Sequence, residues 1–313
     1  MIDWLPAERL DELQAFVDEH WRRGHVLSRD AELLRWQHRR RSDPDMLAVL
    51  VAAEDRHILA MLGWIEFDAC VGEERVPGGW MTNWLVVPEA RGRGLGLALV
   101  EHAMANAYDF IGALGANSAT LHVLGGAGFA KIGMHRWVRV FDDDALRGLL
   151  GGREYHEVPA PSASAAEGFV GACRDEAFLD WRYRAHPRFR YELLQDASGF
   201  AAYRIEQVAG SSAKVMRITD VLGGDGLAPA LVEAAEREGA VFADFYCTSP
   251  RFAAPLAGAG FVAVDSLPGR FQPLDFSDRP IVSNFWAAPR LGVDFASGDL
   301  YVTRADSDLD RPN

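Results

Sequence analysis

The stretch at residues 80–104, WMTNWLVVPEARGRGLGLALVEHAM, predicts a strand, a Pro-Glu turn, a glycine-rich bend and a long helix that opens near Gly94. Three glycines of the bend alternate with Arg91, Arg93 and Leu95. Glycine leaves the backbone N–H groups unobstructed by Cβ atoms, and the positive end of the helix dipole follows directly. The sequence therefore predicts an anion site at this bend, most simply a phosphate site.

Two common phosphate-binding motifs do not fit the bend. The dinucleotide fingerprint requires G-x-G-x-x-G, whereas these glycines are evenly spaced, and the Gly-Lys-Ser/Thr that closes a P-loop is absent. The remaining pattern, RGRGLG directly after VPE, resembles the pyrophosphate loop of the GCN5-related N-acetyltransferases (GNAT). The resemblance implies that acetyl-CoA, or another acyl-CoA, binds to Arg91, Gly92, Arg93, Gly94, Leu95 and Gly96. The alternative is a glycine-rich turn without a ligand.

The net charge of −13 argues against nucleic acid as a partner, because phosphate backbones are bound by clustered Lys and Arg side chains. No stretch approaches the roughly 20 apolar residues of a membrane span, and the N-terminus lacks a basic region followed by an apolar one. We therefore expect a cytoplasmic protein without a membrane partner. At 313 residues the chain is long enough for two domains.

The three cysteines, Cys70, Cys173 and Cys247, are isolated and have no C-x-x-C spacing. Neither a disulfide framework nor a zinc site is indicated, so we expect three small core residues. With no cysteine near the glycine-rich bend, a covalent acyl-enzyme is not suggested either.

Helical and strand patterns continue on both sides of the bend. Helical spacing comes first, at residues 6–21 and 31–36, followed by strands at 47–53, 58–67 and 78–87. After the helix of the bend come a short strand at 110–116, a helix from residue 118 and a strand at 134–141. This order resembles that of the N-acetyltransferases.

The second half of the chain repeats the first. The matching segments are ELLRWQHR at 32–39 with AFLDWRYR at 177–184, LALVEHA at 97–103 with PALVEAA at 229–235, and GGAGF at 125–129 with AGAGF at 257–261. We predict an α/β (α+β) fold of two tandem GNAT-like domains, each a mixed, largely antiparallel sheet flanked by helices. The expected limits are 1–150 for the acyl-CoA-binding domain, 151–167 for a linker, 168–289 for a degenerate copy and 290–313 for a tail.

The second copy is expected to lack the cofactor. Its loop, VLGGDGLA at 221–228, is shorter by two residues, has no arginine, and places Asp225 where a pyrophosphate would sit. We expect it to supply substrate-binding surface, to bury the first domain or to form a homodimer.

The acidic tail carries Asp306, Asp308 and Asp310, which resemble the start of a calcium loop without its glycine and its late glutamate. We expect no metal there, and a tail that is either solvated or docked near the active cleft.

The family resemblance also assigns roles to the strand before the bend. It implies that Leu85 donates its N–H to the developing oxyanion, and that Val87 bonds pantetheine through a free backbone N–H. Val86, between them, is also expected to bind the cofactor. Asn117, eleven residues before Gly128, matches the family asparagine that approaches the cofactor.

Acid and base are less clear from the sequence. The family tyrosine that protonates the departing thiolate is replaced by Leu124. Glu66 is the first candidate for the base, Asn83 a candidate for orienting substrate or water, and His135 the third candidate. Each of the three could equally be a structural residue.

We therefore expect transfer of an acetyl or other acyl group from coenzyme A to a primary amine of a small molecule, by direct attack in a ternary complex. The W-Q-H and W-R-Y elements and the D-x-D-x-D-R-P-N end resemble acyltransferases of surface-polysaccharide gene sets, which favours an amino sugar as acceptor. A non-catalytic acyl-CoA sensor is the alternative. An aminoacyl transferase that uses charged RNA conflicts with the net charge.

Overall fold

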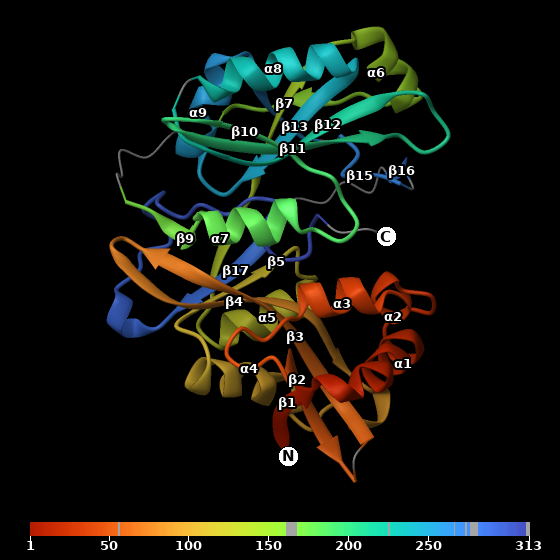
Figure 1. Cartoon of the computed structure of the whole chain (residues 1–313), viewed down its shortest axis with the longest axis vertical. Coiled ribbons are helices and arrows are strands. Elements are labelled where there is room, and N and C mark those ends of the chain that lie inside the picture. The colour runs from red at the N-terminus through yellow and green to blue at the C-terminus, as the bar shows by residue number, and fades with distance from the viewer. Residues whose placement is uncertain are drawn as a thin grey trace.

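The chain was analysed as a computed structural model, which describes residues 1–55, 57–160, 168–224, 226–265, 267–272, 274–275 and 281–310. It contains two mixed sheets, one in the lower and one in the upper half of Figure 1, each flanked by helices. The predicted α/β class with two largely antiparallel sheets is confirmed.

The first sheet has the strand order β1-β2-β3-β4-β5-β17-β6, with β9 paired to β3. Its only parallel pair among the described strands is β4 with β5. The strands are β1 (Ile2–Pro6), β2 (Met46–Glu54), β3 (His57–Val71), β4 (Glu74–Val86), β5 (Phe110–Leu114), β6 (Ala130–Gly133), β9 (Val170–Ala172) and β17 (Val282–Ala287).

Helices cover this sheet with the apolar faces that their sequence periodicity predicts. They are α1 (Leu10–His20), α2 (Val26–Arg29), α3 (Ala31–Gln37), α4 (Leu95–Asn106) and α5 (Ser118–Gly126). In α1, for example, Leu10, Leu13 and Val17 are buried against β2 and β3. Burial of such side chains stabilises the domain by about 1.5–3 kcal/mol each.

The second sheet has the order β10-β11-β12-β13-β7-β14-β8. Its described parallel pair, β12 with β13, takes the place that β4 and β5 take in the first sheet. The strands are β7 (His135–Val140), β8 (His156–Glu157), β10 (Glu192–Asp196), β11 (Gly199–Gln207), β12 (Lys214–Leu222), β13 (Ala240–Cys247) and β14 (Val262–Asp265). Its helices are α6 (Asp143–Leu150), α7 (Glu176–Leu179), α8 (Leu227–Glu238) and α9 (Pro250–Gly258), and a short ribbon is formed by β15 (Arg270–Phe271) and β16 (Leu274–Asp275).

Two strands are exchanged between the halves of the chain. The strand predicted at 134–141 as the last of the first domain is β7, and it lies between β13 and β14 of the second sheet. The equivalent slot in the first sheet, between β5 and β6, holds β17 from the C-terminal half. The reason is the connection: only Met134 separates β6 from β7, which is too short for the chain to reverse into a hairpin. The expected domain limits therefore do not divide the sheets.

The matched tryptophans of the repeat meet at the junction of the halves. The rings of Trp36 and Trp181 stack with centroids 5.1 Å apart. The indole N–H of Trp36 donates to the carbonyl oxygen of Trp181 at 3.1 Å, and the reverse bond has 3.4 Å. Equivalent residues of the two copies thus make the same contact with each other, as across a two-fold axis.

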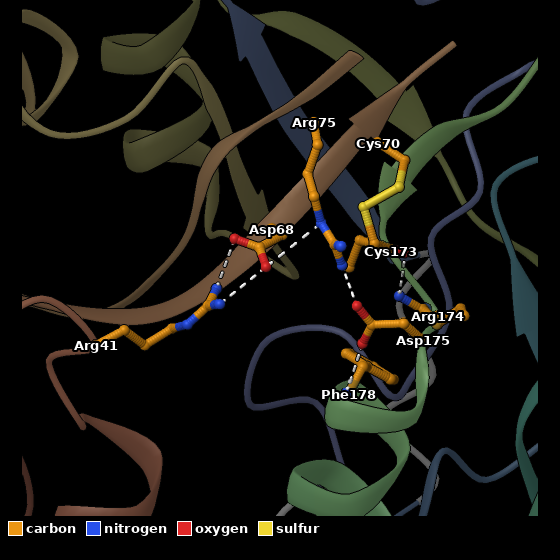
Figure 2. The surroundings of a disulfide bond; sticks show 9 residues. Arg41, Asp68, Cys70, Arg75, Cys173, Arg174, Asp175 and Phe178 are labelled. Atoms are coloured by element: carbon orange, nitrogen blue, oxygen red, sulfur yellow. Dashed lines mark hydrogen bonds and ion pairs between the residues drawn. A yellow bond between two sulfur atoms is a disulfide. The ribbon is translucent and has the colours of Figure 1, made fainter. Parts of the chain in front are cut away.

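The expectation of three free thiols is wrong for two of them. Cys70 of β3 and Cys173, directly after β9, form a disulfide (Figure 2). They are 103 residues apart in sequence, and only the pairing of β9 with β3 brings them together. Beside them, Arg75 forms an ion pair with Asp175 across the same junction. Cys247 is free and buried, as expected.

Candidate functional site

The parallel strands β4 and β5 separate partway along their length. They pair from Gly78 with Phe110 to Met81 with Ala113. Beyond that point β5 ends at Leu114, whereas β4 continues to Val86. The last residues of β4 therefore have β3 on one side and no β5 partner on the other, which leaves alternate backbone N–H groups facing an opening.

A bulge at Asn83 marks the point of separation. The pairing of β3 with β4 shifts its register between Met61 and Gly63, and Asn83 has a φ of 43°. Asparagine tolerates this left-handed conformation better than most residues. Bulges often re-aim side chains next to active sites, and here the bulge directs β4 away from β5.

The register decides which N–H groups of β4 are available. The N–H of Val87 donates to the carbonyl oxygen of Leu59 at 3.0 Å, so the prediction that Val87 offers a free donor is wrong. The strand alternates with period two, so Leu85, which lies opposite Met61, also directs its N–H toward β3. Val86 is the predicted residue whose N–H faces the opening. A shift of one residue in the alignment with the family exchanges the two edges toward which the N–H groups of a strand point, and this explains the error.

The glycine-rich bend forms an open cradle between β4 and α4. Gly92 and Gly94 have φ values of 77° and 75°, and nothing lies within 4 Å of the position of an added Cβ. Ala98 donates its N–H to Gly94 at 3.0 Å, so the N–H groups before Ala98 have no carbonyl partner within the helix. Arg91 and Arg93 are exposed beside them. This is the arrangement of donors and charge that an anion requires.

The two arginines of the cradle contact different partners. Arg93 forms an ion pair with Glu54. Arg91 donates from Nε to the carbonyl oxygen of Val86 at 3.3 Å, so its remaining nitrogens lie at the end of the open β4 edge. At the other end of the bend, a Cβ on Gly96 would lie 3.1 Å from the indole nitrogen of Trp84, so a larger residue would press against the Trp84 ring.

The corresponding loop of the second copy is closed. A Cβ on Gly223 would lie 2.6 Å from the carbonyl oxygen of Ser198 in the β10–β11 turn. Gly224 donates its N–H to the Ser198 hydroxyl at 3.1 Å, and Gly226 lies against the Asp196 carboxylate. These contacts occupy the place of a ligand. Asp225, whose charge is expected to repel a pyrophosphate, lies outside the described residues.

The separation of β12 from β13 is likewise filled, by the tail. The hydroxyl of Tyr301 bonds to the Asp220 carboxylate and to the carbonyl oxygen of Val221, and it accepts the N–H of Val221 at 3.0 Å. On the other side, Thr248 donates its N–H to Val302 at 3.0 Å. The tail is expected to be either solvated or docked near the active cleft, and its described part is docked.

A cavity of about 710 Å³ lies between the two copies, next to the open edge of β4. The first copy lines it with Thr82, Asn83 and Trp84 of β4 and with the N-terminus of α5. The second copy and the tail line it with Arg204, Glu206, Arg217, Tyr246, Arg304 and Asp308. No local signal in the sequence marks this second wall, because its members come from distant strands and from the tail.

Two predicted residues reach the cavity. Asn117 caps α5, because its side-chain oxygen accepts the N–H of Thr120 at 2.9 Å, and it lies in the cavity wall. Asn83 is 6% exposed, and neither polar atom of its side chain has a hydrogen-bond partner among the described residues. The same holds for the hydroxyl of Thr82. Buried polar groups of this kind require a water or a ligand.

Glu66, the first candidate for the base, is not among the cavity-lining residues. Its carboxylate accepts hydrogen bonds from the Arg40 guanidinium at 2.5 Å, the Arg41 N–H at 2.7 Å and the Tyr108 hydroxyl at 2.9 Å. Burial and this carboxylate raise the pKa of Tyr108 well above its usual value. The interactions assign Glu66 to the structural core of the first copy.

His135 and Leu124 also lie away from the cavity. His135 pairs with Cys247 in the second sheet, as a result of the strand exchange, and burial lowers its pKa. Leu124 is fully buried among Leu99, Val100 and Phe129. A tyrosine could not act as an acid from that position without a change in the packing.

Comparison with known proteins agrees with this geometry. A family model described as the Acetyltransferase (GNAT) family matches residues 11–136. A GCN5-related N-acetyltransferase from Kribbella flavida aligns with a TM-score of 0.56 at 16% identity, over 94% of this chain and 72% of its own. One from Anabaena variabilis aligns with a TM-score of 0.54 at 13% identity, over 90% and 72%. No curated protein matches the chain.

A third structure, a conserved protein from Enterococcus faecalis described as a probable N-acyltransferase, has a TM-score of 0.51 at 11% identity, over 92% of this chain and 72% of its own. At such identities the likeness establishes the fold. The chain thus has the GNAT fold in both halves, and its first half matches the family model, which supports an acyltransferase. No described helix is long and apolar enough to cross a bilayer. The described residues contain no group of three His, Cys, Asp or Glu side chains that could hold a metal.

Proposed function

We propose that the first copy binds an acyl-CoA and transfers its acyl group to a primary amine of a small molecule. One observation carries the proposal: the open edge of β4 runs into an open glycine cradle in the first copy, whereas both places are filled in the second. A protein that needed only the scaffold would have no reason to keep one of the two sites clear.

The backbone supplies most of the binding. The N–H groups of residues 92–96 would hold the pyrophosphate, with the helix dipole of α4 and the Arg91 charge behind them. The N–H of Arg91 itself donates to the Pro88 carbonyl oxygen at 3.3 Å. The Val86 N–H lies on the open side of β4, where it would donate to the pantetheine arm or to the thioester oxygen. Donors fixed in a strand need no reorganisation as charge develops, so such groups are usually the largest contribution to catalysis.

The acceptor would enter the cavity between the copies. An amine must lose a proton before it attacks a carbonyl. Thr82 and Asn83 carry unpartnered polar atoms beside the β4 opening, and we assign to them the orientation of the amine or of a water that takes the proton. A covalent acyl-enzyme is not proposed, because Cys247 is buried and burial raises its pKa to about 12.

The thiolate product needs no strong acid. A thiol has a pKa of about 8.5, so it leaves tolerably near neutral pH. With Leu124 in the core, general acid help of about 10²–10⁴-fold is absent from that position. We therefore expect a slower enzyme than one with a tyrosine there.

The test is an Arg91→Glu variant, measured by calorimetric titration with CoA. Reversal of a charge at a phosphate removes at least one charge-assisted hydrogen bond of about 1.5–3 kcal/mol, so binding should weaken more than tenfold. Gly226→Glu, at the matching loop of the second copy, should leave CoA binding nearly unchanged. Equal effects of the two variants would contradict the proposal.

A non-catalytic acyl-CoA sensor is the second candidate, favoured by the buried Leu124. Mass spectrometry of acyl transfer to a panel of amines separates the two functions. Tight CoA binding without turnover of any amine would support the sensor. We also propose an amino sugar as the acceptor, a homodimer and a cytoplasmic location. The Cys70–Cys173 disulfide makes the location testable, because disulfides are rare in the cytosol.

A further inference from the structure

The two walls of the cavity differ in charge. Every charged residue of the described lining, Arg204 and Asp310 among them, comes from the second copy or the tail. The first-copy wall, which contains Asn83 and the open edge of β4, is uncharged. An acceptor that presents its amine to β4 therefore places its other end against charged side chains.

The described lining holds as many carboxylates as guanidinium groups: Glu206, Asp275, Asp308 and Asp310 beside Arg204, Arg217, Arg270 and Arg304. Ion pairs join part of this wall with residues behind it into one buried cluster of Arg136, Arg204, Arg217 and Arg304 with Glu206, Asp244 and Asp310. Asp244, which is fully buried, is shared by three of the arginines. Uncompensated charge in a buried place is costly, so a buried arginine of this wall whose nitrogens have no partner favours an anion.

Arg217 and Arg304 are the members with the weakest compensation. Arg217 reaches Glu206 at 3.2 Å and Asp244 at 3.3 Å, and burial together with the Arg304 charge lowers its pKa to about 10. Arg304 lies 3.9 Å from Asp244, and its Nε and Nη1 have no hydrogen-bond partner among the described residues. Arg204, by contrast, donates to Asp310 from both Nε and Nη2, and its Nη1 lies 3.1 Å from Glu206.

One further arginine stands at the cavity wall. Arg270 of β15 is exposed and lines the cavity. Its neighbour Gly269 accepts hydrogen bonds from Arg217 at 2.7 Å and from Arg304 at 3.3 Å, so the three guanidinium groups belong to one region.

We propose that the acceptor is an amine that also carries an anionic group, a carboxylate or a phosphate, which binds to Arg217, Arg304 and Arg270 while the amine faces β4. The inference rests on the proposed acyl transfer and adds the substrate class. The planar guanidinium group matches both a carboxylate and a phosphate in geometry, so the proposal covers both anions. The experiment below distinguishes one from the other.

The first experiment measures acyl transfer by the full chain to matched amines. The pairs are γ-aminobutyrate with γ-aminobutyramide, and O-phosphoethanolamine with ethanolamine. We expect the anionic member of one pair to have a kcat/KM at least tenfold above its neutral partner, and the pair that shows this identifies the anion. Arg270→Gln should reduce this preference roughly tenfold without a change in CoA binding, because one charge-assisted contact is lost. Arg147→Gln, an exposed arginine of α6, is the matched control and should change nothing.

The second experiment does not depend on turnover. Inorganic phosphate and acetate are titrated by thermal shift into Arg91→Glu, in which the cofactor cradle no longer attracts phosphate. We expect saturable stabilisation by at least one of them, and a tenfold weaker effect once Arg270→Gln is added. If no amine is acylated, the proposed function fails while this titration still decides the anion site. Equal use of neutral and anionic amines, or equal stabilisation with and without Arg270, would overturn the inference.

Discussion

Removal of the Cys70–Cys173 disulfide should lower stability substantially and leave the folded structure unchanged. The bridge closes a loop between residues 103 apart. Chain-entropy estimates assign about 4.7 kcal/mol to a loop near this length. With an unfolding entropy of about 2.1 cal/mol/K per residue, this corresponds to a fall in Tm of roughly 7 °C for this chain. The folded state should persist, because β9 remains paired with β3 and Arg75 remains paired with Asp175.

The assay compares the oxidised protein with a Cys70→Ala, Cys173→Ala double variant by calorimetry, and counts thiols by alkylation and mass spectrometry after denaturation. The oxidised protein should show one alkylated cysteine, Cys247, and the reduced protein three. Cys247→Ala is the control, since its effect on Tm should not depend on reductant. Three alkylated cysteines without reductant, or equal Tm values for the two proteins, would refute the reasoning.

Two further predictions concern stability. His186 is buried, and burial with the nearby Arg182 charge lowers its pKa to about 3. Below its ordinary pKa of about 6.5 the unfolded chain takes up a proton that the folded chain does not, so stability should fall by up to ~1.4 kcal/mol per pH unit between pH 6.5 and 3. Urea denaturation at several pH values should show that the unfolding free energy of His186→Gln falls less steeply as the pH is lowered. An unchanged pH dependence of the unfolding free energy would contradict this. Tyr301→Phe leaves the Val221 N–H without its acceptor and should lower the unfolding free energy by about 1–3 kcal/mol in chemical denaturation. A loss within experimental error would show that the Tyr301 contact between β12 and β13 does not stabilise the fold.

The elements and the duplication were predictable because their signals are local. The spacing of Leu10, Leu13 and Val17 shows a helix face, and the glycines of the bend need no distant partner to adopt positive φ. The repeat appears in the sequence as matched segments, and the structure has two mixed sheets with one described parallel pair each. Such features depend on neighbours within a few residues.

What the sequence did not reveal depends on distant contacts or on exact register. Cys70 and Cys173 meet only because β9 joins β3. The acidic tail fills an opening in the second sheet because the Tyr301 hydroxyl finds Val221, a contact across 80 residues. The N–H of Val86 rather than that of Val87 faces the open side of β4 because of the pairing register, which the family motif alone fixes only to within one residue.

The reciprocal stacking of Trp36 and Trp181, together with the exchange of β7 and β17, is the geometry of a strand-swapped homodimer whose two subunits have become one chain. In a dimer of identical chains, a mutation that closes one cofactor loop closes both. Covalent fusion removes that constraint, because each half can then mutate by itself while both still complete each other's sheet. One half could therefore give up its ligand and become the wall against which the other half's substrate is held.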